Sequence, residues 1–408
     1  MHVIPARSGP FQLRSLLGGI YLPALLFATG QGMVVPIIPL FAKELGAGVA
    51  IAGVVVAMRG LGSMVGDVPS GLLVSRLGGR TTMAAGALLT AVSAAAIGFS
   101  DGVPLLAAFV LVNGVAFALW HVSRLAFLTE VVPPAYRGRA LSLVGGTSRV
   151  GLLVGPIAGG LLGQAAGLEA AFFAQAGVVG AAALLVLVRM GRRPAVEPGA
   201  AERPRLSLRS VVRAERRSLL VAGSVAVALV LIRHGRQILI PLWGDAIGLD
   251  VAQIGLVFGL ASAVDMTLFY PVGVVMDRWG RKWTIVPSLA VLSLSLMLIP
   301  LTGGFASFLA VGLLGGFGNG LGSGAVMTLG ADLAPPEAAG EFLGVWRLVG
   351  DVGAASAPAA VGGLAAAFTL GAAAVATGGV GVIGAVTMLV LVRETLRREG
   401  AEARVAPG

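Results

Sequence analysis

Twelve apolar runs of about 20 residues each dominate this chain of 408 residues. A bilayer core about 30 Å thick needs roughly 20 apolar residues for each helical span. Backbone polar groups in lipid must be satisfied within the chain, so only helices or a closed barrel can cross a membrane. Because the apolar residues form continuous runs and do not alternate with polar ones, helices are favoured over a barrel. The sequence therefore predicts an all-α integral membrane protein with twelve transmembrane helices.

The runs fall into two groups of six. We place spans 1 to 6 at 16–41, 51–74, 82–100, 105–129, 140–163 and 170–190, and spans 7 to 12 at 218–242, 252–275, 284–303, 306–330, 342–366 and 369–392. The first run is too long for a signal-peptide core and no small-residue cleavage site follows it, so we expect it to remain as span 1. The predicted domains are a bundle over 1–190, an arginine-rich cytoplasmic linker over 191–217, a bundle over 218–392 and a cytoplasmic tail over 393–408.

The composition excludes several classes of protein. Hydrophobic residues make up 57% of the chain and charged residues 12%, whereas charged residues make up roughly 25% of a typical soluble domain. The absence of Cys excludes disulfide and thiolate chemistry. The three His are scattered, and the Gly-rich stretches lie inside apolar runs where a phosphate cradle is not expected. We therefore expect no enzyme activity, no metal and no cofactor. The basic residues form short clusters between spans, which argues against nucleic-acid binding.

Lysine and arginine are distributed unevenly across the predicted membrane. Of the 29 Lys and Arg residues, 22 lie in the termini, in the loops on one side or at the end of span 6 on that side (Arg189), one (Lys43) lies on the other side, and six lie deeper within spans. Cytoplasmic segments carry such an excess in membrane proteins. We therefore expect both termini in the cytoplasm and a multi-pass protein of the cell (inner or plasma) membrane. We also expect it to be a monomer in the lipid bilayer.

The second half of the chain repeats the first at an offset of 202 residues. Segment 71–80 (GLLVSRLGGR) aligns with 273–282 (GVVMDRWGRK), and 130–134 aligns with 332–336. The same offset pairs Pro39 with Pro241, Pro69 with Pro271, Gly151 with Gly353, and Pro156 with Pro358. A repeat of this kind predicts two six-helix bundles with a binding site between them near the middle of the membrane.

The loop after span 8 resembles the signature of the major facilitator superfamily, G-x-x-x-D-R-x-G-R-[RK], and the copy after span 2 resembles it in part. In the first copy Ser75 replaces the acid and Gly79 replaces a basic residue. The resemblance implies that these loops latch the cytoplasmic side of the two halves, with Asp67 as a candidate substitute for the missing acid. The gating residues it implies are Asp67, Gly71, Arg76, Gly78, Arg80, Gly273, Asp277, Arg278, Gly280, Arg281 and Lys282.

Span 5 carries a second family signature. Its residues Gly151, Gly155, Pro156, Gly159 and Gly160 resemble the antiporter motif found mainly among exporters. Glycines at this spacing form a smooth stripe on one helix face, and the proline permits a bend. The resemblance therefore extends to the twelve-span drug and metabolite:proton antiporter branch. One feature of that branch is absent, because Val110 stands where its span-4 Arg is expected.

Ionisable residues inside the predicted spans are the candidate substrate and ion pathway, since charge within a bilayer is costly and usually functional. They are Arg59, His121, Arg124, Arg149, Arg233, His234, Arg236, Asp265, Arg347 and Asp351. None lies on spans 3, 6, 9 or 12, which face lipid in the family. Because arginine outnumbers aspartate in this set, we expect the cavity to attract anions.

Each charged residue also has a structural interpretation. Arg347 and Asp351 are spaced to pair on one helix face. Arg233 and Arg236 share a face and are placed where they can snorkel to the outer surface. Arg124 is positioned either to pair with Asp67 as a gate or to contact substrate. For Arg59 and Arg149 a cavity position is favoured over snorkelling.

Proton coupling requires a group that changes its protonation state. The candidates, in order, are Asp265, Asp351, His121 and His234. The sequence thus favours proton-coupled efflux of a small, anionic metabolite or drug by alternating access, driven by the proton gradient. The alternatives are an importer or uniporter of a small metabolite and a non-transporting membrane sensor on the same scaffold.

Overall fold

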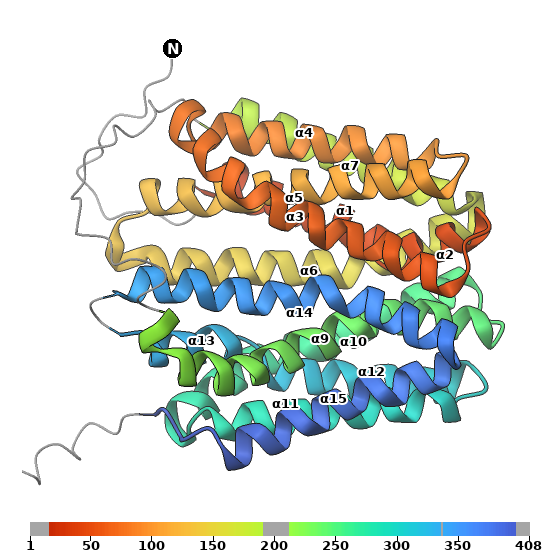
Figure 1. Ribbon diagram of the computed structural model, residues 1–408. Helices are drawn as coiled ribbons and strands as arrows, with labels where there is room; N and C mark the ends of the chain where they lie inside the picture. Colours follow the sequence, from red (N-terminus) through yellow and green to blue (C-terminus); the bar gives the residue numbers. More distant parts are fainter. Residues whose placement is uncertain (1–15, 191–211, 336–337, 397–408) are drawn as a thin grey trace, which may run out of the picture.

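The twelve predicted spans are present as helices in a computed structural model of the protein, which describes residues 16–190, 212–335 and 338–396. Within these ranges the model has 12 helical segments long and apolar enough to cross a membrane, and it has no strand. Figure 1 shows the helices running side by side, with the first six spans in one bundle and the last six in another. The prediction of an all-α membrane protein with a six-plus-six arrangement is confirmed.

Spans 1 to 6 form the N-terminal half. They comprise η2 (Leu17–Tyr21), α1 (Leu22–Val34) and α2 (Ile37–Glu44) for span 1, then α3 (Val49–Leu77), α4 (Gly79–Gly98), α5 (Val103–Val131), α6 (Pro134–Ala166) and α7 (Leu168–Arg189). Span 1 is interrupted between α1 and α2 because Pro36 has no N–H to continue the helical hydrogen bonds. The sequence prediction treated this span as continuous.

Spans 7 to 12 form the C-terminal half. They comprise α9 (Arg216–Ala246), α10 (Val251–Trp279), α11 (Lys282–Leu298) with η3 (Ile299–Leu301), α12 (Phe305–Leu321) with α13 (Ala325–Leu333), α14 (Ala339–Ala367) and α15 (Leu370–Val390). The second unpredicted interruption divides span 10 at residues 322–324, where Gly324 has φ +74°. Most of the proposed linker and tail lies outside the described residues, so those domain bounds stay predictions.

The two halves repeat each other in three dimensions. A Cβ on Gly114 of α5 would lie 2.1 Å from the carbonyl oxygen of Arg59 on α3. A Cβ on Gly316 of α12 would lie 2.3 Å from the carbonyl oxygen of Ala261 on α10. Both residues of the second pair are 202 positions after those of the first. The sequence offset is thus also a packing equivalence.

The seam between the halves consists of two equivalent contacts, α6 against α10 and α14 against α3. A Cβ on Gly53 would meet the carbonyl oxygen of Pro358 at 2.5 Å, and one on Gly255 would meet that of Pro156 at 2.3 Å. Such close backbone approach is possible only because glycine has no side chain. These contacts close the seam near the starts of α3 and α10. We call this end of the molecule, which lies away from the two loop motifs, the opposite face.

The other end of the molecule, where α3 and α10 terminate, is called the loop-motif face. Here the seam is looser. Among the described residues, no atom lies within 4 Å of a Cβ placed on Gly145 of α6 or on Gly273 of α10. Gly71 of α3 and Gly344 of α14 are equally unobstructed. The two halves therefore pack tightly at the opposite face and loosely at the loop-motif face.

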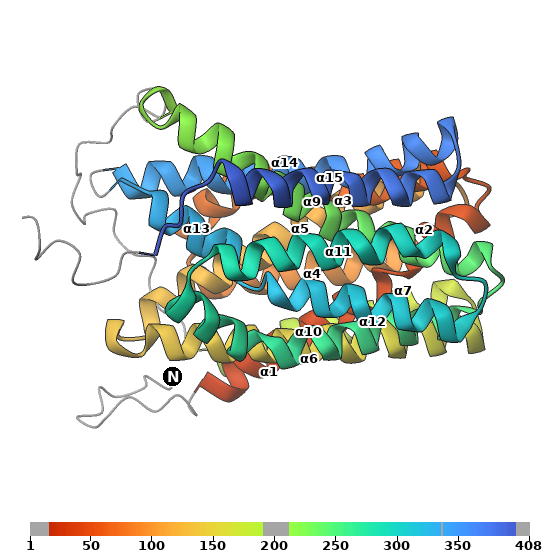
Figure 2. The same cartoon turned by 90° about the horizontal axis from the view of Figure 1, so that it is seen from below.

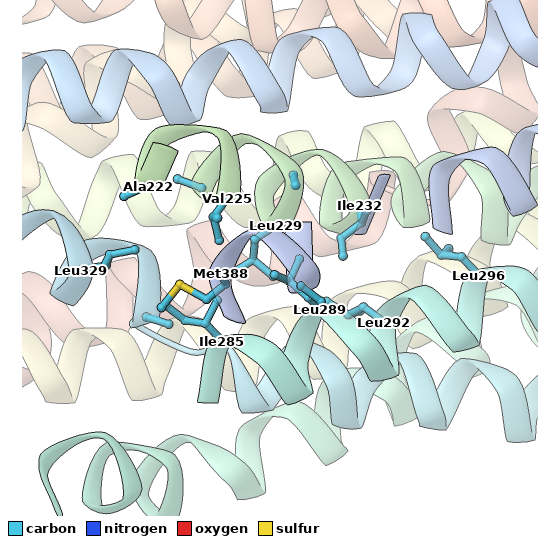
Figure 3. Packing of buried hydrophobic residues seen from close by; sticks show 14 of the residues in the cluster. Ala222, Val225, Leu229, Ile232, Ile285, Leu289, Leu292, Leu296, Leu329 and Met388 are labelled. Atoms are coloured by element: carbon cyan, nitrogen blue, oxygen red, sulfur yellow. The ribbon is translucent and has the colours of Figure 1, made fainter. Parts of the chain in front are cut away.

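The core of the C-terminal half lies between α9, α11 and α15. Leu229 and Ile232 of α9, Leu289 and Leu292 of α11, and Met388 of α15 are fully buried there, and Figure 3 shows them converging. In Figure 2, seen from below, α11, α12 and α15 lie on the near side of the molecule. These side chains fix the bundle, and the charged residues described next lie on α3, α5, α6, α9, α10 and α14.

Candidate functional site

A cavity lies between the two halves of the protein. Its volume is about 140 Å³. The N-terminal half contributes Gly32, Val35, Arg149, Leu152 and Pro156 to its wall, and the C-terminal half contributes Arg236, Gln237, Phe258, Ser262, Asp265 and Asn319. This is the inter-bundle position at which the sequence repeat predicts a site. Three of the ten predicted pathway residues line it, namely Arg149, Arg236 and Asp265.

An ion pair crosses the cavity from one half to the other. The Arg149 guanidinium on α6 donates to Asp265 Oδ2 on α10 at 2.8 Å, and its second amino group donates to Ser323 Oγ at 3.1 Å. The guanidinium also lies over the Phe269 ring, 4.3 Å from the ring centroid. Both charged side chains are mostly withdrawn from solvent, with 21% and 16% of their surface exposed. The predicted cavity position of Arg149 is therefore observed, with Asp265 as its partner.

The interruption of span 10 supplies two further contacts. Ser323 lies in the break between α12 and α13, and its Oγ is 3.5 Å from Asp265 Oδ1. The Arg233 guanidinium on α9 donates to the Asn319 carbonyl oxygen, in the last turn of α12, at 3.0 Å. A cation there is stabilised by the negative end of the helix dipole. Sequence reasoning missed Ser323 and Asn319; the Gly322–Gly324 pair was the signal that could have indicated a break.

Arg233 and Arg236 do not snorkel to the surface, as one interpretation of their positions allowed. Only 9% of the Arg236 surface is exposed. Its stem passes α12 where Gly315 leaves room, since a Cβ there would lie 3.3 Å from Arg236 Cδ. The physical reason is that the face of α9 that carries Arg236 is turned inward, against α11 and α12. The guanidinium therefore ends in the cavity between the halves and not at the outer surface of the membrane.

In the N-terminal half, Arg59 of α3 lies against side chains of α1 and α5. It donates to the Gln31 side-chain oxygen on α1 and lies over the Phe117 ring, 5.6 Å from the centroid. His121 stacks against the Phe117 ring, and the two ring centroids are 5.8 Å apart. His234 of α9 is different, because its Nδ1 lies 2.9 Å from the Val230 carbonyl oxygen on the same helix.

A second ion pair joins the halves closer to the loop-motif face. Arg347 of α14 donates to Asp67 Oδ2 of α3 at 3.2 Å, and it also lies 3.9 Å from Asp351 on its own helix. The predicted Arg347–Asp351 pair is thus present but secondary. The suggested Arg124–Asp67 pair is not formed, since the Arg124 guanidinium instead approaches Ser148 Oγ at 3.5 Å. Arg347 reaches Asp67 first because α14 packs directly on α3.

The opposite face carries an ion pair that sequence reasoning did not identify. Lys43, after span 1, contacts Asp245, after span 7. The two residues occupy equivalent positions, 202 apart. The available signal was that the repeat has a base at this position in the first half and an acid in the second. Equivalent residues that lie close to a two-fold axis approach each other across it.

The two loop motifs make contacts within their own halves. Arg80 donates to the Leu187 carbonyl oxygen, and Lys282 donates to that of Leu389 at 2.9 Å. These contacts are equivalent at the offset of 202. Arg76, Asp277 and Arg278 are exposed. The role of these loops as an inter-half latch stays a prediction, since the described contacts hold each loop to the last helix of its own bundle.

In the described part of the chain, the second loop contacts the segment that follows α15. The Arg281 side chain donates two hydrogen bonds, of 2.7 and 3.1 Å, to the Asp332 carboxylate. Gly280 (φ +109°) ends α10, and the Glu394 carboxylate accepts from the backbone N–H groups of Arg281 and Lys282 at 2.9 and 3.1 Å. Burial raises the pKa of Glu394, but these hydrogen bonds outweigh it and hold the pKa below its usual range. In the first motif Gly79 occupies the position of Arg281, so the side-chain hydrogen bonds of Arg281 have no counterpart there.

The span-5 glycines form the predicted smooth stripe. Cβ atoms on Gly151, Gly155 and Gly159 would lie 2.6, 2.4 and 2.2 Å from backbone atoms of Thr29 and Met33 on α1. Gly160 faces another neighbour, the Val251 carbonyl oxygen on α10. Span 5 is therefore held against span 1 and span 8 together, and Arg149 projects from it into the cavity.

Comparison with known proteins agrees with this architecture. The sequence profile of the Major Facilitator Superfamily matches the chain twice, over residues 20–233 and 225–407. The multidrug resistance protein MdtH of Enterobacter sp. (strain 638) is 24% identical over 336 residues, covering 79% of this chain and 80% of that protein. The class C tetracycline resistance protein of Escherichia coli is 28% identical over 316 residues, covering 72% and 76%.

A solved structure shares the fold. It is a bacterial homologue of the human lysosomal transporter Spinster, in an inward-facing and unoccupied conformation. The TM-score is 0.72 at 13% identity, over 94% of this chain and 96% of that one. At this identity the likeness concerns the fold alone.

Proposed function

The chain belongs to the major facilitator superfamily and is a membrane transporter, and on this premise we propose that it exports a small anionic metabolite or drug in exchange for protons. The observation that carries the proposal is the Arg149–Asp265 ion pair, which joins the two halves across the cavity. A proton on Asp265 neutralises the carboxylate and removes the pair. Protonation is thereby linked to the freedom of the two halves to rock against each other.

The packing of the seam defines the side from which the cavity is approached in this conformation. The halves are tightly joined at the opposite face and loosely joined at the loop-motif face. The excess of Lys and Arg on that side supports a cytoplasmic position for it, with both termini inside the cell. Resemblance to resistance proteins and the span-5 glycine motif support export.

The charge of the cavity supports an anionic cargo. Three guanidinium groups, those of Arg149, Arg233 and Arg236, gather around the single carboxylate of Asp265. Field lines in a cleft with low-dielectric walls concentrate ions of the opposite sign. A monoanion is therefore attracted and a lipophilic cation repelled.

The test is a proton-exchange assay in everted vesicles of the bacterial inner membrane, where we place the protein. A respiration-driven pH gradient is followed with a pH-sensitive dye, and naphthalene-2-sulfonate is added as a permanently charged anion. We expect the anion to dissipate the gradient only when the protein is present. A matched naphthylmethyl trimethylammonium cation serves as the control for charge. Dissipation by the cation alone contradicts the choice of cargo, and dissipation by neither contradicts proton exchange.

A further inference from the structure

Arg236 is the one cavity arginine with no hydrogen-bond acceptor among the described residues. We propose that it anchors a subsite for the anionic group of the cargo, with the apolar body of the cargo lying against the N-terminal half. The proposal rests on the proposed function only in taking the occupant to be a cargo; the subsite itself is a matter of binding. The ligand class is a monoanion of carboxylate or sulfonate type attached to an apolar group.

The burial of Arg236 makes an unpartnered guanidinium unusual. Its side chain lines the cavity and is 91% buried, since only 9% of its surface is exposed. Its Nε and one terminal nitrogen are buried and have no acceptor in the described part of the chain. Buried charged donors are normally paired or hydrogen-bonded, because leaving them unsatisfied is costly. The charge of this guanidinium therefore lacks a described partner, and an anion in the cavity that Arg236 lines would compensate it.

The neighbouring arginines are already committed. Arg149 donates to Asp265 and Ser323, and Arg233 donates to the carbonyl oxygen of Asn319. Asp265 lies within electrostatic reach of Arg236, but it forms no ion pair with it within 4.0 Å. These contacts hold the guanidinium groups of Arg149 and Arg233 in place, and that of Arg236 is available to bind an anion.

The rest of the wall matches an amphiphilic anion. Gln237 and Ser262 come from the same side of the cavity as Arg236 and add neutral hydrogen-bonding groups. Leu152 and Pro156 face them from the N-terminal half and are apolar. A ligand with a charged head and an apolar body satisfies both surfaces. A small hydrophilic anion leaves the apolar wall unused.

The repeat shows that the fold does not require this polarity. The positions equivalent to Arg236, Gln237 and Ser262 in the N-terminal half are Val34, Val35 and Gly60. The same scaffold is therefore stable with small apolar residues at these places. The polar set is present in one half only, as expected for a binding site and not for a structural feature.

The space for Arg236 is also specific to the C-terminal half. Gly315 stands beside its stem, and the equivalent residue of the other half is Asn113, whose amide donates to Ser93 at 3.0 Å. Where the first half has Val34 and Asn113, the second has Arg236 and Gly315. The absence of a side chain at Gly315 thus leaves room for that of Arg236.

The experiment measures binding of naphthalene-2-sulfonate to purified full-length protein, by calorimetry and by the shift of its thermal unfolding. The neutral naphthalene-2-sulfonamide and the naphthylmethyl trimethylammonium cation are tested beside it on the unaltered protein. We expect the sulfonate to bind and to raise the unfolding temperature, and the other two to do neither. Arg236→Gln is expected to weaken sulfonate binding by roughly 10- to 100-fold, the loss associated with a hydrogen-bonded charge. Arg236→Lys restores part of it.

Arg137→Gln is the matched control. Its guanidinium donates to the carbonyl oxygens of Thr129 and Val132, so like Arg236 it has no acidic partner among the described residues, and it does not line the cavity. It removes the same charge and should leave sulfonate affinity unchanged. Equal binding by Arg236→Gln and the unaltered protein overturns the subsite, as does tighter binding of the sulfonamide or the cation. If Arg236→Gln does not fold, the comparison of the three probes on the unaltered protein decides. Sulfonate binding without proton exchange in vesicles overturns the proposed function and leaves the subsite standing.

Discussion

The two halves of this protein share a scaffold and divide the chemistry between them. The seam glycines Gly53 and Gly255 occupy equivalent positions and approach equivalent carbonyl groups. The cavity residues do not follow this symmetry, because Asp265 is matched by Ser63 and Asn319 by Phe117. Contacts that hold the bundles together are thus repeated, whereas groups that can bind a proton or an anion are concentrated in the C-terminal half. The N-terminal half contributes Arg149 as a counter-charge.

The largest expected effect comes from removing the Asp265 carboxylate, which is replaced by Ser63 at the equivalent position of the N-terminal half. Loss of one partner from a buried ion pair costs about 3–5 kcal/mol, more than roughly 100-fold in an equilibrium. Asp265→Asn should therefore abolish proton-driven export of naphthalene-2-sulfonate while sparing exchange of the anion across the membrane. Vesicle transport with and without a proton gradient measures both.

Asp351→Asn is the control for that substitution. Asp351 lies 3.9 Å from Arg347, which keeps its closer partner Asp67. We expect proton-driven export to fall only about 2- to 5-fold, because a partly exposed pair contributes up to about 1 kcal/mol. An equal loss in the two variants contradicts the assignment of the coupling proton to Asp265.

The next effect tests the part of the structure that is symmetric. Gly255→Ala and Gly53→Ala each place a Cβ within 2.5 Å of a carbonyl oxygen across the seam. Overpacking of this kind costs about 1–3 kcal/mol, so both variants should lower the unfolding temperature of the purified protein by similar amounts. Gly146→Ala on α6, where no described atom lies within 4 Å, should not. Different losses at Gly53 and Gly255 would show that the seam is functionally one-sided.

A third effect concerns the loop motifs. Because hydrogen bonds lower the pKa of Glu394 in the folded protein, its contribution to holding the chain end is present above the ordinary glutamate pKa of about 4.3. The contribution is lost as the pH falls through the lower, folded value. Since the protein has no Cys, the single substitution Leu396→Cys gives a clean labelling site. Because only the thiolate reacts, its labelling rate is divided at each pH by that of Leu396→Cys in the Glu394→Gln background, which cancels the loss of thiolate on acidification. This ratio should be well below one at neutral pH and should rise severalfold towards one as the pH falls below about 4.3.

The smallest effect is expected at the Lys43–Asp245 pair. The side chains are 35% and 43% exposed, and exposed ion pairs contribute about 0.2–1 kcal/mol. Lys43→Asp with Asp245→Lys should restore the stability lost in either single variant, and the coupling should shrink at high salt. A double-mutant cycle on thermal unfolding measures it. A coupling well above this range would mean that the pair, and not the glycine seam, closes the opposite face.

Much of the architecture followed from short stretches of sequence. The twelve apolar runs predicted every span, and the motif glycine Gly280 marks the end of α10. The positions of the charged side chains were predicted only as far as the helix that carries them. Arg347 has two acids within reach of its helix face, Asp351 along the helix and Asp67 across the seam. Helical spacing reveals the first and is silent on the second, because a contact between segments 280 residues apart has no local signature.

The sequence by itself determined the solvent of this protein, the number of its spans, its family and its internal repeat. Each depends on a property that is local or periodic: the length of an apolar run, the residues of a turn, or a fixed offset. The tertiary structure decided which charges meet, that span 10 is broken at Ser323, and that Arg236 has no hydrogen-bond acceptor in the described part of the chain. These depend on how two bundles approach each other, and a difference of one helical turn in that approach changes every pairing at the cavity. The repeat predicted where a site would lie, and the packing of unlike halves decided what the site can bind.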